Sequence, residues 1–359
     1  MNPIERLSER LIHGDAKKAV LVHSRPNRYY LTSFPSSAGI LLVTAGKAYY
    51  LLDFRYAEAA RAKAKGAEVV DLMNMDETLK GLLTKHGVQE VYMEYTALPY
   101  GTAMRYKKIC ESAGAEAIFD TTLDDALKAQ RIIKSEEEIG KIAAAQAITD
   151  KAFTHILGFI HAGVTEREIA LELEFFMRGN GADGNAFNPI VVTGKNGSQC
   201  HGVPGDTVVQ DGDLITMDFG AMLNGYNSDM TRTVAVGSAS EEMRKIYEIV
   251  LEAQAIGLRE ARAGRKWSEV DGAARSYIAE QGYGEYFGHG LGHGLGLEVH
   301  ESLSFSAETG DLTPENGVVS CEPGIYLPGK FGVRIEDCVI LKDGGCENLT
   351  KAKKSLLIL

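Results

Sequence analysis

Residues 214–234, LITMDFGAMLNGYNSDMTRTV, contain two strand-like runs on either side of a turn around Asn224. This pattern predicts an antiparallel hairpin with one aspartate on each strand, Asp218 and Asp229. A four-residue loop would place the two aspartates directly opposite each other, whereas a two-residue Asn-Gly turn would place Gly220 opposite Asp229. Because side chains alternate along a strand with a period of two, both registers put the two carboxylates on one face of the sheet.

Residues 318–341, VVSCEPGIYLPGKFGVRIEDCVIL, repeat this arrangement with glutamates. A hairpin that turns at Gly329 places Glu322 opposite Glu336, next to apolar residues that predict partial burial. Solvated surface carboxylates are the alternative for either pair alone, but two buried acidic pairs need positive charge, since unpaired buried charge is costly. Arg334, on the same face as Glu336, is spaced to supply part of it. Two divalent cations would neutralise the four carboxylates.

Residues 288–301, GHGLGHGLGLEVHE, place glycine at every second position from Gly288 to Gly296. Glycine in a strand costs about 0.5–1 kcal/mol relative to alanine, so the alternation indicates that something approaches the backbone closely. We expect His293 to supply an imidazole ligand, and the glycines around it to let the strand approach the metal and the substrate. Oxygen ligands with one imidazole suit manganese, cobalt, iron or zinc better than calcium.

The composition predicts a globular protein and excludes some partners. The chain has 359 residues, 45% of them hydrophobic, and its 38 basic and 49 acidic residues give a net charge of −11. This balance offers no basic surface for a phosphate backbone, so we expect no nucleic-acid partner. No apolar run reaches the roughly 18 residues of a membrane helix, and the N-terminal residues lack an apolar signal core, so we expect no membrane partner and a cytoplasmic location. The scattered cysteines predict reduced thiols.

Two parts of the chain differ in their sequence pattern. In the first part, short β-rich runs alternate with helical segments, which predicts an α/β domain. Long helical patterns follow, and two of them begin with capping boxes at Ser135 and Thr165. We therefore predict an α+β protein with an N-terminal α/β domain at residues 1–125 and a C-terminal domain at residues 126–359. In the C-terminal domain, we expect helices to cover a strongly bent antiparallel sheet.

These motifs, together with CEPGIY and GVRIED, resemble the pita-bread metallopeptidases, the family of methionine aminopeptidase, aminopeptidase P and prolidase. The resemblance covers essentially the whole chain. It implies a two-metal site in the pita-bread fold, and the expected residue types fill all the family's ligand positions, which are Asp218, Asp229, His293, Glu322 and Glu336. We expect two divalent ions per subunit, manganese, cobalt or zinc, with manganese favoured.

The resemblance also implies roles for further residues. In this family a metal-bridging water acts as the hydroxide nucleophile, and the position of Glu322 takes the water proton and passes it towards the leaving nitrogen. His201 and His300 match the catalytic histidines, which hydrogen-bond the tetrahedral intermediate or the substrate backbone. His289 and Arg334 match positions on the proline side of the site in aminopeptidase P and prolidase. The bond cut would then be the one that precedes proline, at the N-terminus of a peptide or dipeptide.

The N-terminal part narrows the choice within the family. RYYLTSF and LLDFRYAEAA resemble the creatinase-like extra domain of prolidase and aminopeptidase P, which simple methionine aminopeptidases lack. The fold also resembles creatinase, which works without metals, and chaperone-like binding modules, but both predict gaps in the ligand set. A methionine aminopeptidase is therefore the runner-up enzyme, and the sequence does not separate prolidase from aminopeptidase P. The resemblance also implies a homodimer and a proline-containing peptide as substrate.

Overall fold

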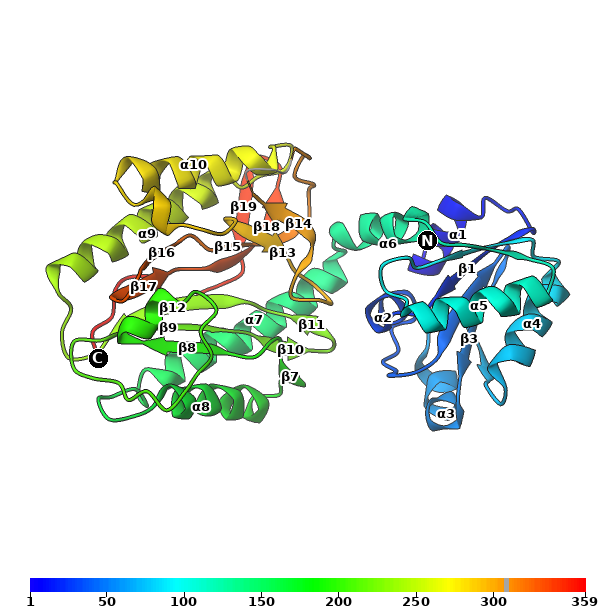
Figure 1. Cartoon of the computed structure of the whole chain (residues 1–359), viewed down its shortest axis with the longest axis horizontal. Coiled ribbons are helices and arrows are strands. Elements are labelled where there is room, and N and C mark those ends of the chain that lie inside the picture. The colour runs from blue at the N-terminus through cyan, green and yellow to red at the C-terminus, as the bar shows by residue number, and fades with distance from the viewer. Residues whose placement is uncertain (307–309) are drawn as a thin grey trace. The chain divides into compact units, whose positions relative to one another are not determined.

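The computed structural model describes residues 1–306 and 310–359, which divide into two compact units, Met1–Arg131 and Ile132–Leu359 (Figure 1). The first unit has the predicted α/β fold, with a six-stranded sheet in the order β4-β3-β2-β1-β5-β6. Its strands are β1 Lys18–Val22, β2 Ile40–Thr44, β3 Lys47–Leu52, β4 Glu68–Asp71, β5 Glu90–Met93 and β6 Glu116–Ile118. Its helices are α1 Pro3–Leu11, α2 Arg25–Thr32, α3 Phe54–Lys63, α4 Met75–His86 and α5 Tyr100–Ser112, and α6 Thr122–Ile132 leads into the second unit.

The central strands of this sheet have continuous apolar sequences because they are buried. β1 pairs antiparallel with β2 and parallel with β5, and every residue of β2 is buried. A strand that is covered on both faces has no solvent-facing side that needs polar residues, so its sequence is an unbroken apolar run.

Capping residues mark the two ends of helix α4. Asn74 Oδ1 accepts the N–H of Asp76 at 3.0 Å at the start of α4, and Gly87, with φ of +62°, ends it.

The second unit combines helices with antiparallel sheets, as predicted. Two sheets have the strand orders β12-β9-β8 and β14-β13-β15-β18-β19, and two smaller ones are β11-β10-β7 and β16-β17. The helices are α7 Glu136–Ile156, α8 Glu166–Gly179, α9 Glu241–Glu260 and α10 Trp267–Glu280. The strands are β7 Gly184–Asn185, β8 Ile190–Thr193, β9 Leu214–Phe219, β10 Ala221–Leu223, β11 Tyr226–Asn227, β12 Met230–Ala235, β13 Gly292–Gly294, β14 Glu301–Phe305, β15 Val318–Cys321, β16 Gly324–Leu327, β17 Phe331–Arg334, β18 Asp337–Lys342 and β19 Gly345–Asn348.

Both predicted capping boxes are confirmed at the starts of α7 and α8. The Ser135 hydroxyl accepts the N–H of Glu138 at 3.3 Å, and the Glu138 carboxylate accepts the N–H of Ser135 at 2.9 Å. Thr165 and Glu168 make the same reciprocal pair. Each box satisfies backbone N–H groups that have no partner within the helix.

Two helical layers enclose the strands of the second unit. One apolar core joins α7 and α8 to β8, β9 and β12, and the other joins α9 and α10 to strands of the five-stranded sheet and of the β16-β17 hairpin. Figure 1 shows the strands lying between these two pairs of helices. Alternation along β9 and β12 therefore separates an apolar face, which packs on α7 and α8, from a second face that carries threonines and acidic residues. No helix within the described residues is long and apolar enough to span a membrane.

A buried ion pair joins β12 to β18. Arg232 Nη2 donates to Asp337 Oδ1 at 2.7 Å, and the two side chains are 1% and 0% exposed. Arg232 also donates to the carbonyl of Glu336 at 2.5 Å and to the carbonyls of Ala352 and Lys353 at 2.9 and 3.0 Å. One guanidinium thus connects two sheets with the C-terminal segment.

We predict that Arg232→Met destabilises the second unit by about 3–5 kcal/mol, because it leaves a buried carboxylate without its guanidinium partner. Although burial alone would raise it, Arg232 and Lys354 hold the pKa of Asp337 below its usual range, so this carboxylate stays charged. The fluorescence of Trp267, the chain's one tryptophan and 1% exposed, reports the urea midpoint. The control Arg259→Met removes an exposed ion pair of α9. A shift no larger than that of the control would contradict the prediction.

Candidate metal centre

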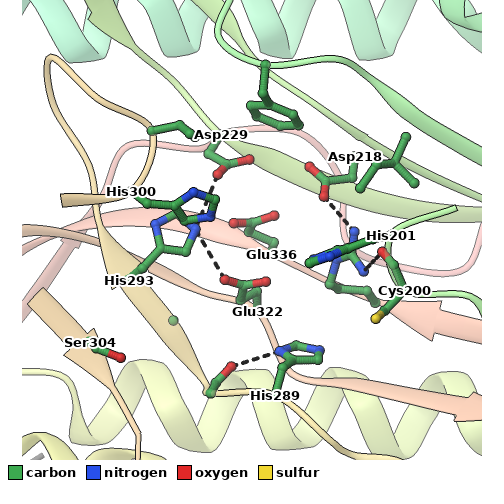
Figure 2. A pocket seen from close by; sticks show the side chains of 16 residues that line it. Cys200, His201, Asp218, Asp229, His289, His293, His300, Ser304, Glu322 and Glu336 are labelled. Atoms are coloured by element: carbon green, nitrogen blue, oxygen red, sulfur yellow. Dashed lines mark hydrogen bonds and ion pairs between the residues drawn. The ribbon is translucent and has the colours of Figure 1, made fainter. Parts of the chain in front are cut away.

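A pocket of about 310 Å³ in the second unit brings the predicted site residues together (Figure 2). Its lining includes every residue for which the sequence predicted a role in the site. These are His201, Asp218, Asp229, His289, His293, His300, Glu322, Arg334 and Glu336. Asp218, His293 and Arg334 lie on β9, β13 and β17, and the others lie on segments beside the strands, so the pocket depends on strands that are far apart in the sequence.

The first hairpin adopts the two-residue alternative. Leu223 pairs with Tyr226, and the turn between them has positive φ at both central residues, +50° at Asn224 and +75° at Gly225, as a type I′ turn requires. In this register Asp218 pairs with Thr231. The four-residue loop, which would place the two aspartates directly opposite each other, is therefore wrong, because Asn224 and Gly225 form a two-residue turn. Both carboxylates still line the same pocket.

The second hairpin keeps the predicted register on both sides of its glutamates. Cys321 pairs with Asp337 in one sheet, and Gly324 pairs with Arg334 in the next. The two glutamates, at positions 322 and 336, occupy the break between these ladders. Freed from a continuous sheet, both side chains reach the pocket.

His293 is the imidazole at the acidic end of the pocket. Its Nδ1 lies 3.1 Å from the carbonyl oxygen of Gly294, which can only accept, so Nδ1 carries the proton and Nε2 offers its lone pair. Nε2 lies 3.5 Å from Asp229 Oδ2 and 3.3 Å from Glu322 Oε1. Burial lowers the pKa of His293, which also favours the neutral ring.

The glycines around His293 make room for other strands. A Cβ at Gly292 would lie 2.0 Å from the carbonyl oxygen of Ser320 in β15, and one at Gly294 would lie 2.9 Å from Leu303 Cβ in β14. The expectation that these glycines serve the metal and the substrate is replaced by this finding. Close packing of β13 between its two neighbours is what excludes a side chain at these positions.

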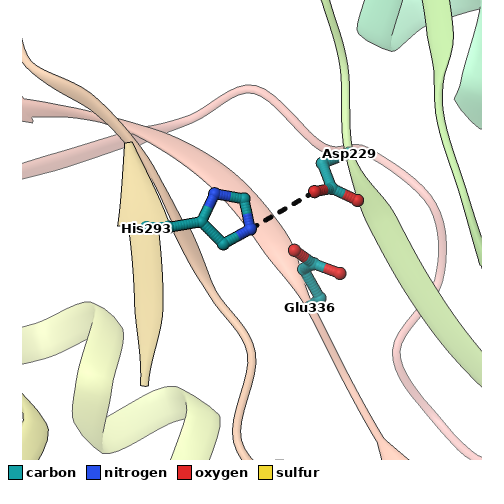
Figure 3. A group of neighbouring side chains, drawn as sticks. All are labelled: Asp229, His293 and Glu336. Atoms are coloured by element: carbon teal, nitrogen blue, oxygen red, sulfur yellow. Dashed lines mark ion pairs between the residues drawn. The ribbon is translucent and has the colours of Figure 1, made fainter. Parts of the chain in front are cut away.

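Asp229, His293 and Glu336 form the group best suited to a metal ion (Figure 3). One ligand atom from each lies within 4.8 Å of the other two. Among the described residues, Asp229 Oδ1, Glu336 Oε1 and Asp218 Oδ1 are buried and lack a hydrogen-bond partner. A divalent cation would satisfy such oxygens, so the donor set fits the expected cofactor. Asp218 and Glu322 line the same pocket but are outside this tight group.

All three nitrogens of the Arg334 guanidinium contact other groups of the protein. Its Nη2 lies 2.5 Å from Asp218 Oδ2, and its Nε donates to Thr231 Oγ1 at 2.9 Å. Its Nη1 donates to the Tyr326 hydroxyl at 2.8 Å and to the Cys200 carbonyl at 3.2 Å. The guanidinium therefore neutralises one of the pocket's carboxylates. Sequence reasoning identified Arg334 but missed Thr231, although Thr231 stands on the same strand face as Asp229, two residues on.

Tyr326 connects this arginine to His289. The Tyr326 hydroxyl lies 2.9 Å from His289 Nε2, while His289 Nδ1 lies 2.8 Å from the carbonyl oxygen of Gly290. Burial and the nearby Arg334 lower the pKa of His289 to about 4, so the ring is neutral near neutral pH and accepts the tyrosine proton. Sequence reasoning also missed Tyr326, because only the fold brings it to His289.

His201 and His300 are exposed at the pocket, unlike His289 and His293. The rings of His293 and His300 meet edge to face with centroids 4.3 Å apart. Two of the pocket's four histidines are thus partly buried and two are exposed. The deeper pair faces carboxylates and tyrosine, and the exposed pair is accessible to a bound ligand.

Two family models match the two units. Metallopeptidase family M24 matches residues 140–343, and the Creatinase/Prolidase N-terminal domain matches residues 4–133. The chain belongs to metallopeptidase family M24. This membership confirms the predicted pita-bread peptidase and implies divalent metal ions as its cofactor.

Several relatives of this M24 peptidase match along nearly their whole length. The Xaa-Pro dipeptidase of Pyrococcus horikoshii is 40% identical over 341 residues, which cover 94% of each chain. The solved Xaa-Pro dipeptidase from Bacillus anthracis has a TM-score of 0.94 and 40% identity, covering 99% of each chain. The X-Pro aminopeptidase from Thermotoga maritima has a TM-score of 0.90 and 38% identity, covering 95% of this chain and 97% of that one.

Burial raises the pKa values of three carboxylates in the pocket, those of Asp229, Glu322 and Glu336, and nearby like charges add to the shift. Burial, followed by the charges of Glu336 and Asp218, raises the pKa of Asp229 well above its usual range. Burial and the charges of Glu322 and Asp218 do the same for Glu336. Burial raises the pKa of Glu322 to about 7, partly offset by Arg334. Without a bound cation, this site therefore retains protons that solvated carboxylates would lose.

We predict that the metal-free M24 peptidase loses stability as the pH rises from about 4.5 to about 7, the interval over which the pKa of Glu322 is raised by folding. In this window the folded state binds more protons than the unfolded state, so deprotonation favours unfolding. Urea midpoints across this range measure the effect. Glu322→Gln should flatten the slope, and an unchanged slope in this variant would contradict the prediction.

We also predict that Asp229→Asn removes most of the bound metal and the activity while leaving the fold largely intact, because it deletes a ligand and relieves repulsion among carboxylates. Metal analysis of the dialysed protein, circular dichroism and a peptidase assay test this. Asp206→Asn is the control, since that side chain is 85% exposed. Full turnover with stoichiometric metal in the Asp229 variant would refute the prediction.

Proposed function

We propose that this M24 peptidase hydrolyses the N-terminal Xaa-Pro bond of peptides or dipeptides. The observation that carries the proposal is the convergence of Asp229, His293 and Glu336 within 4.8 Å, with unpaired carboxylate oxygens, in a pocket lined by all the predicted site residues. The relatives named Xaa-Pro dipeptidase and X-Pro aminopeptidase support this substrate class.

Asp229, His293 and Glu336 would hold one metal ion, and Asp218 and Glu322 would extend the set to two ions per subunit. Manganese is favoured over cobalt or zinc. Such ions supply Lewis acidity and lower the pKa of water, which provides a nucleophile at neutral pH.

Glu322 is the carboxylate best placed to move a proton. Its side chain is 16% exposed, compared with 13% for Asp218 and 6% for Asp229. Ser320 Oγ donates to Glu322 Oε1 at 3.1 Å, which orients the group. We assign to Glu322 the transfer of a proton from the attacking water to the leaving nitrogen.

The exposed histidines and the tyrosine network would bind the substrate. His201 and His300 can donate to the carbonyl oxygen of the bond as negative charge develops on it. Tyr326 links His289 with Arg334 and makes one wall of the pocket, which we assign to the proline side. In this role Arg334 shapes the wall and holds Asp218 rather than contacting the substrate directly.

The free α-amine of a peptide would limit cleavage to the first bond. This amine can bind a metal ion or one of the carboxylates that line the pocket. An amine held there would place the first peptide bond, and no later one, at the reacting atoms. Homodimeric assembly and a cytoplasmic location stay predictions of the sequence.

A panel of peptides tests the proposal. We expect the metal-stripped protein to be inactive and to recover cleavage of Xaa-Pro or Xaa-Pro-Xaa peptides when it is reloaded with manganese, cobalt or zinc, because the carboxylates need a cation to bind water. Cleavage of the dipeptide alone means a prolidase, and cleavage of the longer peptide means an aminopeptidase P. Activity confined to Met-Ala would support the methionine aminopeptidase alternative, and no metal-dependent cleavage at all would refute the proposal.

A further inference from the structure

The loop between β13 and β14 presents His300 to the pocket. His300 is exposed, yet its ring keeps an edge-to-face contact with His293 at a centroid distance of 4.3 Å. An exposed side chain gains little restraint from packing, so its position depends on the backbone that carries it. The support for this loop therefore matters for any reaction in which His300 takes part.

A buried ion pair lies directly beneath this loop. Lys134 Nζ lies 3.0 Å from Glu301 Oε2, and the two side chains are 2% and 6% exposed. The other carboxylate oxygen, Glu301 Oε1, accepts the backbone N–H groups of Leu297 at 2.9 Å and of Glu298 at 3.4 Å. The Glu301 carboxylate thus binds the backbone of the loop that precedes it, and Lys134 holds this carboxylate in place.

Gly296 shows how tightly the pair is packed. A Cβ there would lie 2.8 Å from Glu301 Oε1 and 2.9 Å from Lys134 Cε. The carbonyl oxygen of Gly296 accepts the backbone N–H of Asn227 at 2.8 Å and its side-chain amide at 3.1 Å. Asn227 stands two residues before Asp229, so the same loop is tied to the segment that carries a predicted metal ligand.

Lys134 is itself fixed by the backbone. Its N–H donates to the carbonyl of Asn316 at 2.9 Å, and Ile133 forms an antiparallel bridge with Gly317. The ammonium group therefore extends from a rigid support. A buried ion pair adds little net stability compared with apolar residues of similar volume, so the fixed geometry of this pair is the feature that bears on His300.

We infer that Lys134 and Glu301 form a positioning pair that holds His300 in place for Xaa-Pro hydrolysis. The inference rests on the proposed function for its catalytic meaning and on the contacts above for its geometry. Neither residue is among those that line the pocket, so each acts on His300 through the backbone of the loop. Lys134, at the start of the second unit, would thereby control a residue more than a hundred and sixty positions away, since the pair spans 167 positions.

Lys134→Met tests the inference through its dependence on His300. We expect the variant to keep its metal content and to lose about 10–100-fold in kcat with a much smaller change in KM, because a displacement of about 1 Å at a reacting group can cost that much. In a His300→Ala background, Lys134→Met should cause no further loss. Equal losses in both backgrounds would show a merely structural role and overturn the inference.

Gly296→Ala is a second variant, which disturbs the pair without changing its charge. It should reproduce the kinetic pattern of Lys134→Met. The control Lys330→Met removes an ion pair whose side chains are 58% and 47% exposed and should leave kcat unchanged.

Crystal structures of the metal-free variants give a readout that does not need activity. We expect the His293–His300 ring distance, which is 4.3 Å here, to differ between the wild-type crystal structure and those of Lys134→Met and Gly296→Ala. An unchanged ring geometry in both would overturn the inference even in an active enzyme. A wild-type protein that cleaves no Xaa-Pro peptide would instead overturn the proposed function, while the ring geometry still decides the inference.

Discussion

The mutual repulsion of four carboxylates around one buried pocket is the constraint on which the second unit depends. Burial and neighbouring charges raise the pKa values of Asp229 and Glu336, so the arrangement opposes its own ionisation. Arg334 offsets part of this by pairing with Asp218. Divalent cations would offset the charge of the remaining carboxylates, and metal binding then becomes part of the protein's stability.

The sheets withstand this repulsion because each strand uses its two faces differently. On β12, Thr231 turns to the pocket and donates to Glu336 Oε2 at 2.7 Å, while its neighbour Arg232 pairs with Asp337. The two acidic residues are adjacent on the chain but have separate cationic or hydroxyl partners. Because side chains alternate with a period of two, the neighbouring residues Glu336 and Asp337 point to opposite faces, one into the pocket and one into a structural ion pair.

The sequence predicted which residues line the pocket better than it predicted their contacts. Residue types and alternation were enough to place Asp218 and Asp229 on one face, because that result does not depend on the register. The register itself depended on whether residues 224 and 225 both adopt positive φ, which two loop lengths left open. Tyr326 was missed for a different reason, because its contact with His289 spans 37 positions and exists only after β16 packs beside the loop that precedes β13.

Histidines illustrate why burial must be known before a role is assigned. Burial lowers the pKa of His289 to about 4, and its neutral ring completes a network with Tyr326. His300 is exposed, where it can meet a ligand but gains little support from packing. A side chain in that position depends on its backbone for precision, and backbone precision needs a buried anchor. This requirement gives a physical reason for a lysine and a glutamate to be buried together beside the loop that carries His300.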